Sequence, residues 1–274
     1  MKMLLLLITV ITLGFTSKVM ATAKTEKIEQ CNSDSCKQYF KQYKIAAKRG
    51  HPLAMLTLGQ FYKNGYGVEA NEKLALKYFK KAAKAGFTAA QLHAGYIYMT
   101  SDEHYDIDKS IKYLSRAAYY KDKNANFLLS ILYFDKRYQR RDLKKVDQYL
   151  AMAYEQKHKQ VPEAIAYIET EMPIDSATFP ELTKAQEVVA LVKNQQGVLE
   201  WPKDEMEVIT ITSPPLEDMF NEQLMAFRKP IKSTGTRFKG KTCTERQSCS
   251  IRMQIDDSFE FYLVFLSDIF EGSG

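Results

Sequence analysis

The sequence predicts a mainly all-α fold, an α-solenoid of stacked helices followed by a small C-terminal α+β or irregular region. A pair of small residues recurs along the chain at an almost constant spacing, and the apolar residues around it follow the periodicity of an α-helix. The pattern changes around residues 197–202, after which a β-branched, strand-like stretch begins. We therefore expect helices over most of the chain and strands near its end.

The composition is that of a chain that folds around a buried core. Of the 274 residues, 45% are hydrophobic and 26% are charged, which excludes mostly disordered, collagen-like and polytopic membrane proteins. The formal net charge is +6. Because this charge is weak and dispersed, we expect no nucleic-acid partner.

Residues 1–23 have the order of a secretory signal peptide. A basic start at Lys2 precedes an apolar run over residues 3–15, and small residues follow, with cleavage expected after Ala21 or Ala23. An uncleaved membrane anchor is the alternative, but a spanning helix needs roughly 20 apolar residues. We expect the mature chain in the periplasm of a Gram-negative cell, or secreted, without a transmembrane segment.

The four cysteines form two close pairs, Cys31 with Cys36 and Cys243 with Cys249. Close pairs in an exported protein are most often structural disulfides. Neither pair is a Cys-x-x-Cys motif, and the four histidines do not supply the ligand spacing of a zinc site. We expect two local disulfides and no metal or other cofactor.

The repeat has a period of 35 to 36 residues and predicts a capped helix in each unit. In each copy a large apolar residue is followed, one helical turn later, by a pair of small residues, the last pair being decayed. The pairs begin at Ala46, Ala82, Ala117 and Ala153, and the large residues are Tyr43, Phe79, Leu114 and Leu150. Further upstream, at the same repeat position in every copy, lies a residue that favours helix N-caps. These residues are Ser35, Asn71, Asp106 and Asp142.

Each unit is predicted to contain one more helix, which has a small residue at its centre. This residue is Gly59, Gly95 or Ser130 in successive units, and it allows a neighbouring helix to approach closely. In the best-preserved unit an Asn-Gly-Tyr-Gly-Val loop over residues 64–68 joins the two helices, and its glycines permit the backbone angles of a tight turn.

These motifs resemble the Sel1-like repeat. The stretches Ala-Met-Leu-Thr-Leu-Gly-Gln-Phe-Tyr, Asn-Gly-Tyr-Gly-Val and Ala-Leu-Lys-Tyr-Phe-Lys-Lys-Ala-Ala-Lys-Ala-Gly match it over residues 54–86. Residues 87–121 match without the glycine loop, and residues 122–157 match weakly. The resemblance implies a right-handed, tetratricopeptide-like α-solenoid. It also implies scaffolding of protein complexes or peptide binding, often at bacterial envelopes.

The predicted boundaries divide the chain into five parts. They are a signal peptide (1–23), a disulfide-stapled N-terminal lead (24–34), the repeat solenoid (35–160), capping helices (161–199) and a C-terminal region with a local disulfide (200–274). The capping helices are expected over residues 161–171 and 180–193, because the end of a solenoid needs a polar outer surface.

Six residues are candidates for a binding ladder on the concave face, which the resemblance assigns to the first helix of each unit. By phase they form two rows, Leu56, Leu92 and Phe127, and Gln60, Tyr96 and Ile131. Such a ladder receives a peptide or helix in a groove. The alternative is that these residues pack between units or against later helices.

The C-terminal region contains a basic segment over residues 228–252, with eight basic residues and one acid. Residues 207–212 are predicted to be a strand and residues 216–227 a short helix. The segment offers four candidate contacts for an anionic partner: Arg237, Lys239, Lys241 and Arg246. Acidic residues follow closely, so neutralisation within the chain or by solvent is the alternative.

No motif of an enzyme is present, and we expect a non-catalytic protein. The sequence lacks a Gly-x-Ser-x-Gly elbow, a His-Glu-x-x-His motif and a phosphate-binding glycine loop. The favoured function is an exported scaffold or adaptor that binds a protein or peptide in the cell envelope. One alternative is an envelope hydrolase or β-lactam-binding enzyme like cysteine-rich Sel1-like proteins, and another is an anionic lipid or glycan-binding module.

Overall fold

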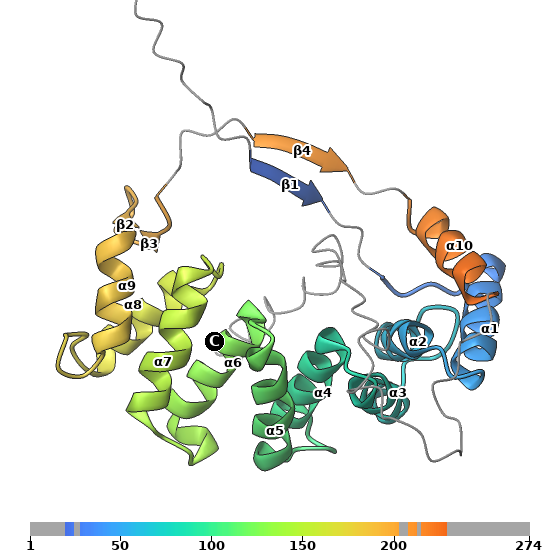
Figure 1. The fold of residues 1–274 in the computed structure, drawn as a ribbon, viewed down its shortest axis with the longest axis horizontal. Helices are drawn as coiled ribbons and strands as arrows, with labels where there is room; N and C mark the ends of the chain where they lie inside the picture. The colour runs from blue at the N-terminus through green and yellow to red at the C-terminus, as the bar shows by residue number, and fades with distance from the viewer. Residues whose placement is uncertain (1–19, 25–27, 203–207, 213–214, 229–274) are drawn as a thin grey trace, which may run out of the picture.

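The computed structural model describes residues 20–24, 28–202, 208–212 and 215–228, and its helices follow one another in an arc (Figure 1). The helices are α1 (Asp34–Lys48), α2 (Pro52–Asn64), α3 (Glu72–Lys84), α4 (Thr88–Thr100), α5 (Ile107–Tyr119), α6 (Lys123–Phe134), α7 (Leu143–Glu155), α8 (Val161–Glu171) and α9 (Pro180–Val188). From α1 to α8 each helix packs against the next along the chain, and α9 packs against α7. A 3₁₀ turn, η1 (Lys136–Tyr138), lies between α6 and α7. The prediction of a mainly all-α solenoid is confirmed.

Side-chain caps begin the repeated helices. Asn71, Asp106 and Asp142 each accept a hydrogen bond from a backbone N–H of the first turn of α3, α5 and α7, as the repeat predicts. The prediction for α1 is wrong, because Ser33 rather than Ser35 is the N-cap and accepts from the Cys36 N–H. The helix begins one residue before Ser35, which therefore lies inside its first turn.

The helices alternate between two kinds of burial. Helices α3 and α5 bury one face and expose charged residues on the other, whereas α2, α4 and α6 are buried over most of their surface. The small central residues explain the close packing. A Cβ added at Gly95 would lie 2.7 Å from the Leu114 Cγ of α5, a distance that real Cβ atoms do not show.

The N-terminal lead is fixed to the glycine loop between α2 and α3. A disulfide joins Cys31 to Cys36, the first of the two pairings that the sequence predicts. The Gly67 N–H donates to the Cys31 carbonyl over 2.6 Å, and the Asn64 side chain donates to the Ile28 carbonyl over 2.9 Å. The lead therefore packs as part of the first unit.

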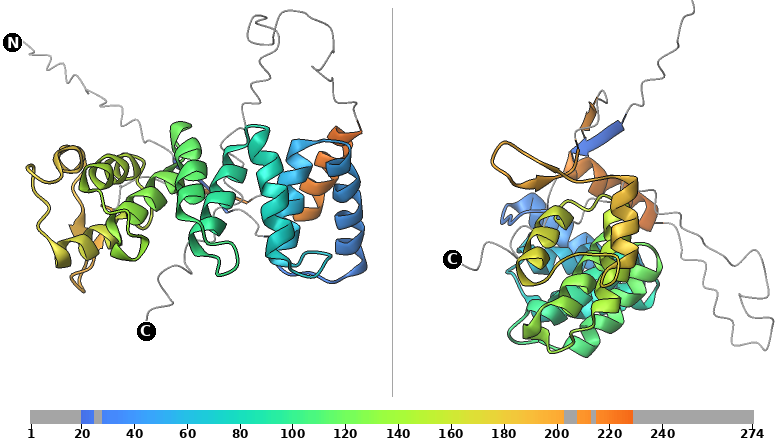
Figure 2. Two further views of the ribbon diagram at one scale, coloured as in Figure 1. Left: turned by 90° about the horizontal axis from the view of Figure 1, so that it is seen from below. Right: turned by 90° about the vertical axis from the view of Figure 1, so that its left-hand side faces the viewer.

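The first helix of the solenoid is covered by α10 (Leu216–Phe227), which comes from the C-terminal region (Figures 1 and 2). Phe220 is 1% exposed, and its ring contacts those of Tyr43 and Phe61 at centroid distances of 5.4 and 5.3 Å. The Tyr43 hydroxyl donates to the Gln223 Oε1 over 2.7 Å. The helix is predicted from sequence, but its place is not: it closes one end of the repeat array.

The other end is closed by α8, α9 and a short hairpin. Asp147 of α7 accepts from the backbone N–H groups of Glu181 and Leu182 and so caps α9. The prediction of one helix over residues 180–193 is wrong. The helix ends at Val188, which is 81% exposed, and β2 (Val192–Lys193) pairs antiparallel with β3 (Leu199–Glu200).

A two-stranded parallel sheet pairs a segment near the N-terminus with a strand that precedes α10. In it, β1 (Met20–Lys24) pairs with β4 (Val208–Thr212), with Met20 opposite Val208. Both cleavage positions predicted from the sequence lie in β1, so cleavage there would shorten this strand. Within the described residues, no helix is long and apolar enough to cross a membrane.

Several predicted residues lie outside the described part of the chain. They are the second cysteine pair, Cys243 and Cys249, and the candidate contacts for an anionic partner, Arg237, Lys239, Lys241 and Arg246.

Candidate interaction surface

The predicted concave-face ladder is mostly interior. Leu56, Leu92 and Phe127 are 3%, 3% and 0% exposed, and Gln60 is 2% exposed. Their helices, α2, α4 and α6, are each packed between neighbouring helices, so the chain's own side chains cover these positions. The interpretation of these four residues as binding contacts is therefore wrong. Tyr96 and Ile131 remain half-buried.

Buried amide–imidazole pairs explain why polar residues occur in this interior. The Gln60 Nε2 donates to the His93 Nε2 over 2.5 Å, which joins α2 to α4. Nearly two units further on, the Asn124 Oδ1 lies 3.1 Å from the His158 Nε2. Because the Gln160 N–H donates to the His158 Nδ1, the Nε2 of His158 carries the proton and donates to the Asn124 Oδ1.

Both imidazoles are held neutral by the interior. Burial, assisted by the positive charge of Lys63, lowers the pKa of His93 well below its ordinary value. Burial and the charge of Lys123 lower the pKa of His158 to about 4. Each ring also stacks on a phenylalanine, His93 on Phe79 and His158 on Phe127. These histidines are cross-links between units and not candidate catalytic groups.

A stacked tyrosine pair recurs in every unit, close to the surface. The pairs are Tyr62 with Tyr78, Tyr98 with Tyr113, and Tyr133 with Tyr149, at centroid distances of 5.7, 5.8 and 6.0 Å. A cation lies near each pair: the Lys81 Nζ is 5.5 Å from the Tyr78 ring, and the Arg116 Cζ is 6.0 Å from the Tyr113 ring. The units thus present aromatic rings and positive charge together.

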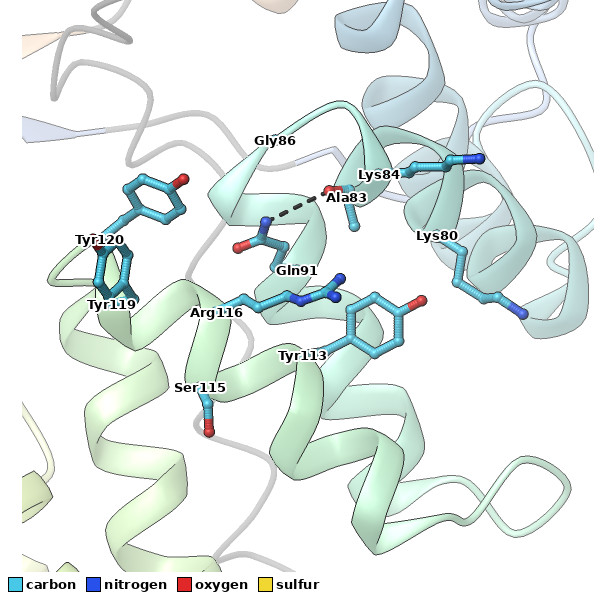
Figure 3. Close-up of a pocket in the computed structure, with 10 residues that line it drawn as sticks. All are labelled: Lys80, Ala83, Lys84, Gly86, Gln91, Tyr113, Ser115, Arg116, Tyr119 and Tyr120. Carbon is cyan, nitrogen blue, oxygen red and sulfur yellow. Dashed lines mark hydrogen bonds between the residues drawn. The ribbon is translucent and has the colours of Figure 1, made fainter. Parts of the chain in front are cut away.

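An open groove between α3 and α5, about 950 Å³ in volume, combines these groups, and we call it the α3–α5 groove (Figure 3). It is lined by Lys80, Ala83, Lys84, Gly86, Gln91, Tyr113, Ser115, Arg116, Tyr119 and Tyr120. Helix α3 supplies lysines, α5 supplies Arg116 and two tyrosines, and Gln91 comes from α4 beneath.

The α3–α5 groove is positively charged. Among the described residues that line it, none is an aspartate or glutamate, whereas three are cationic: Lys80, Lys84 and Arg116. A second hollow shares Lys80 and continues toward the loop before α5, with Lys73 and Lys77 along its α3 side. There Asp106 pairs with Lys109 over 2.6 Å and Glu103 also lines the hollow. Of these two hollows, the α3–α5 groove is the one whose described lining residues include no carboxylate.

Two tyrosines at one end of the groove are unusually exposed. Tyr119 is 83% exposed and Tyr120 is 61% exposed, and their rings meet edge to face at 5.4 Å. Figure 3 shows them across the groove from Gln91. Exposed tyrosines beside an arginine are the residues that most often dominate protein–protein binding.

The other titratable residues that the structure describes form no compact reactive cluster. Among the described residues, no group of three or more His, Cys, Asp or Glu side chains is placed to hold a metal ion. Glu103 and His104 lie 3.9 Å apart at the surface.

Comparison with known proteins identifies the units on which the groove lies. The family model described as Sel1 repeat matches residues 52–87 and 88–119, which are α2 with α3 and α4 with α5. Residues 52–119 belong to the Sel1 repeat family. The α3–α5 groove therefore lies between the second helices of two adjacent Sel1 repeats. Sel1 repeat proteins generally mediate protein–protein interactions.

The relatives that these comparisons find have low sequence identity or cover only part of this chain. Chitin synthase regulatory factor 4 of Schizosaccharomyces pombe is 33% identical over 100 residues, which are 35% of this chain and 16% of that protein. The solved structures include c5321, a protective antigen of uropathogenic Escherichia coli with an SLR fold, at 17% identity and a TM-score of 0.48 over 56% of this chain and 33% of that one. A Sel1 repeat protein of Oxalobacter formigenes has 25% identity and a TM-score of 0.44 over 56% of this chain and 64% of that one. This chain thus spans less than two thirds of each of these proteins.

Sequence reasoning missed the groove, although it had one signal for it. Tyr119 and Tyr120 stand at the phase where the preceding unit has Lys84 and Ala85. Two aromatic residues at the solvent-exposed end of a helix are a departure from the repeat that packing within the repeat does not require. Gln91 carried no such signal, because its place in the groove depends on how α3, α4 and α5 meet.

Proposed function

We propose that this protein is an exported, non-catalytic adaptor that holds another protein of the bacterial envelope on the α3–α5 groove. The observation that carries the proposal is the exposed Tyr119–Tyr120 pair beside Arg116, in a groove between two Sel1 repeats. Export is supported by the signal-peptide order of residues 1–23 and by the Cys31–Cys36 disulfide.

The architecture suits an adaptor. A solenoid gains its stability from contacts between neighbouring units, so its outer helices are free to present side chains to a partner. Here α10 and α9 close the two ends of the array, which leaves the lateral grooves as the surfaces for binding.

Site-specific photo-cross-linking tests the proposal. A benzoylphenylalanine placed at Tyr119 in cells that express the full chain should give discrete adducts with one other envelope protein. The matched control is the same group at Tyr167 of α8, which is also an exposed tyrosine, at 50%, and should give none of these adducts. Equal adducts at both positions, or adducts only within the chain or between its copies, would refute the proposed function.

A further inference from the structure

The α3–α5 groove has three cations that no other described residue neutralises. Within the described part of the chain, Lys80, Lys84 and Arg116 make no ion pair or hydrogen bond. Several other surface cations are paired, as Lys136 is with Glu171 and Arg140 with Asp108; the groove differs in that three cations line one hollow without a carboxylate among its described lining residues. Opposed cations on two helices repel each other weakly, so an anion placed between them lowers the free energy of the surface.

A second observation points to a ligand that is more than an anion. Gln91 is 5% exposed and lines the groove, and its Oε1 has no hydrogen-bond partner. Its Nε2 donates to the Ala83 carbonyl over 3.5 Å. This bond orients the Gln91 side-chain amide so that Oε1 points away from Ala83 (Figure 3). A buried acceptor without a donor costs free energy, and a ligand N–H would remove that cost.

The third observation is the aromatic wall. Tyr113 of α5 and the exposed pair Tyr119 and Tyr120 flank the cations. Such rings contact aromatic or aliphatic side chains and contribute large apolar area with few rotatable bonds.

Together these groups specify the chemistry of the occupant, and we infer that the α3–α5 groove binds an acidic, aromatic-containing peptide segment of a partner protein. Carboxylates pair with Arg116, Lys80 and Lys84, a peptide N–H donates to the Gln91 Oε1, and an aromatic side chain packs against Tyr119 and Tyr120. A phospholipid headgroup such as phosphatidylglycerol supplies the charge but no N–H donor for Gln91. This inference rests on the proposed function and names the class of segment that the adaptor holds.

Fluorescence anisotropy with the full chain tests the inference. The probe is a labelled short peptide of alternating glutamate and tyrosine, and the control peptide carries glutamine in place of every glutamate. We expect saturable binding of the acidic peptide, at least about tenfold weaker binding of the glutamine peptide, and loss of affinity in high salt.

Variants locate the binding. Arg116→Glu should weaken binding of the acidic peptide by about tenfold or more, because it places like charges together. Lys159→Glu makes the same change of charge at an exposed position outside the groove and should change binding less than twofold. Gln91→Met keeps the volume of the side chain but removes the acceptor, and should weaken binding while circular dichroism and the unfolding midpoint stay unchanged.

Three results would overturn the inference: equal binding of the two peptides, equal effects of Arg116→Glu and Lys159→Glu, or equal binding of a single-stranded oligonucleotide of the same charge. Anionic vesicles that compete with the peptide through Arg116 would assign the groove to lipid instead. If adducts form at Tyr119 but the acidic peptide does not bind, the adaptor function stands and this choice of partner fails. If neither occurs, both fail.

Discussion

Acidification should destabilise the solenoid through its buried histidines. His158 is 3% exposed, and its neutral ring stacks on Phe127 and bonds Asn124. Burial lowers its pKa to about 4, against an ordinary value of 6.5. Because the folded-state pKa lies below that of the unfolded chain, the unfolded chain takes up the proton first as the pH falls. Stability is therefore unaffected above about pH 6.5 and falls between pH 6.5 and pH 4.

The magnitude follows from this difference in pKa. One pKa unit corresponds to about 1.36 kcal/mol, so the full loss from His158 is about 3 kcal/mol, approached as the pH falls below 4. At pH 5 linkage gives about 2 kcal/mol. The pKa of His93 is lowered in the same direction by burial, so it adds a loss of the same sign.

Urea unfolding at pH 7.5 and pH 5.0 measures this loss. The free energy of unfolding of the unmodified chain should fall by at least about 2 kcal/mol more than that of His158→Gln, which cannot titrate. Comparing the change with pH within each protein removes the cost of the substitution itself. Equal losses in the two proteins would refute the reasoning, because they would show that His158 is protonated in the folded chain.

Two further substitutions, each with a matched control, test the packing of α10 and of the loop between α2 and α3. Phe220→Ala should lower the free energy of unfolding by about 3 to 5 kcal/mol, because it empties a fully buried site between α10 and the first helices; Met225→Ala on the exposed side of α10 should change it by less than about 0.5 kcal/mol. Gly67→Ala should cost roughly 1 to 3 kcal/mol more than Gly197→Ala in thermal or urea unfolding. Both glycines have positive φ, but only a Cβ at Gly67 would strike the Cys36 carbonyl, at 2.2 Å, whereas one at Gly197 meets no atom within 4 Å. A stable Phe220→Ala variant would contradict the packing of α10, and equal costs at the two glycines would contradict the close approach of Gly67 to the first turn of α1.

Features fixed by local sequence could be predicted, and features fixed by distant contacts could not. Asn71 and Asp106 cap helices through bonds to residues three positions away, so the repeat phase found them. The same phase placed Leu56 and Leu92 on one face but could not tell what covers that face. Contacts made by α10 span about 180 residues, as between Tyr43 and Gln223, and no periodicity encodes them.

The α3–α5 groove illustrates the same limit for function. Part of its charge comes from a lysine-rich face of α3, and the sequence predicts that this face is exposed to solvent. Its identity as a site depends on Arg116 and Gln91 meeting that face from two other helices. Only the packing of adjacent units brings these residues together.

A charge exchange between groove and peptide tests the central claim most directly. The variant Lys84→Glu with Arg116→Glu should lose the glutamate–tyrosine peptide and gain saturable binding of a lysine–tyrosine peptide, which the unmodified chain does not bind. Such reciprocal specificity arises only if carboxylates of the ligand lie against these two cations. If the double variant loses the acidic peptide without gaining the basic one, or if both proteins bind both peptides alike, the α3–α5 groove is not the binding surface.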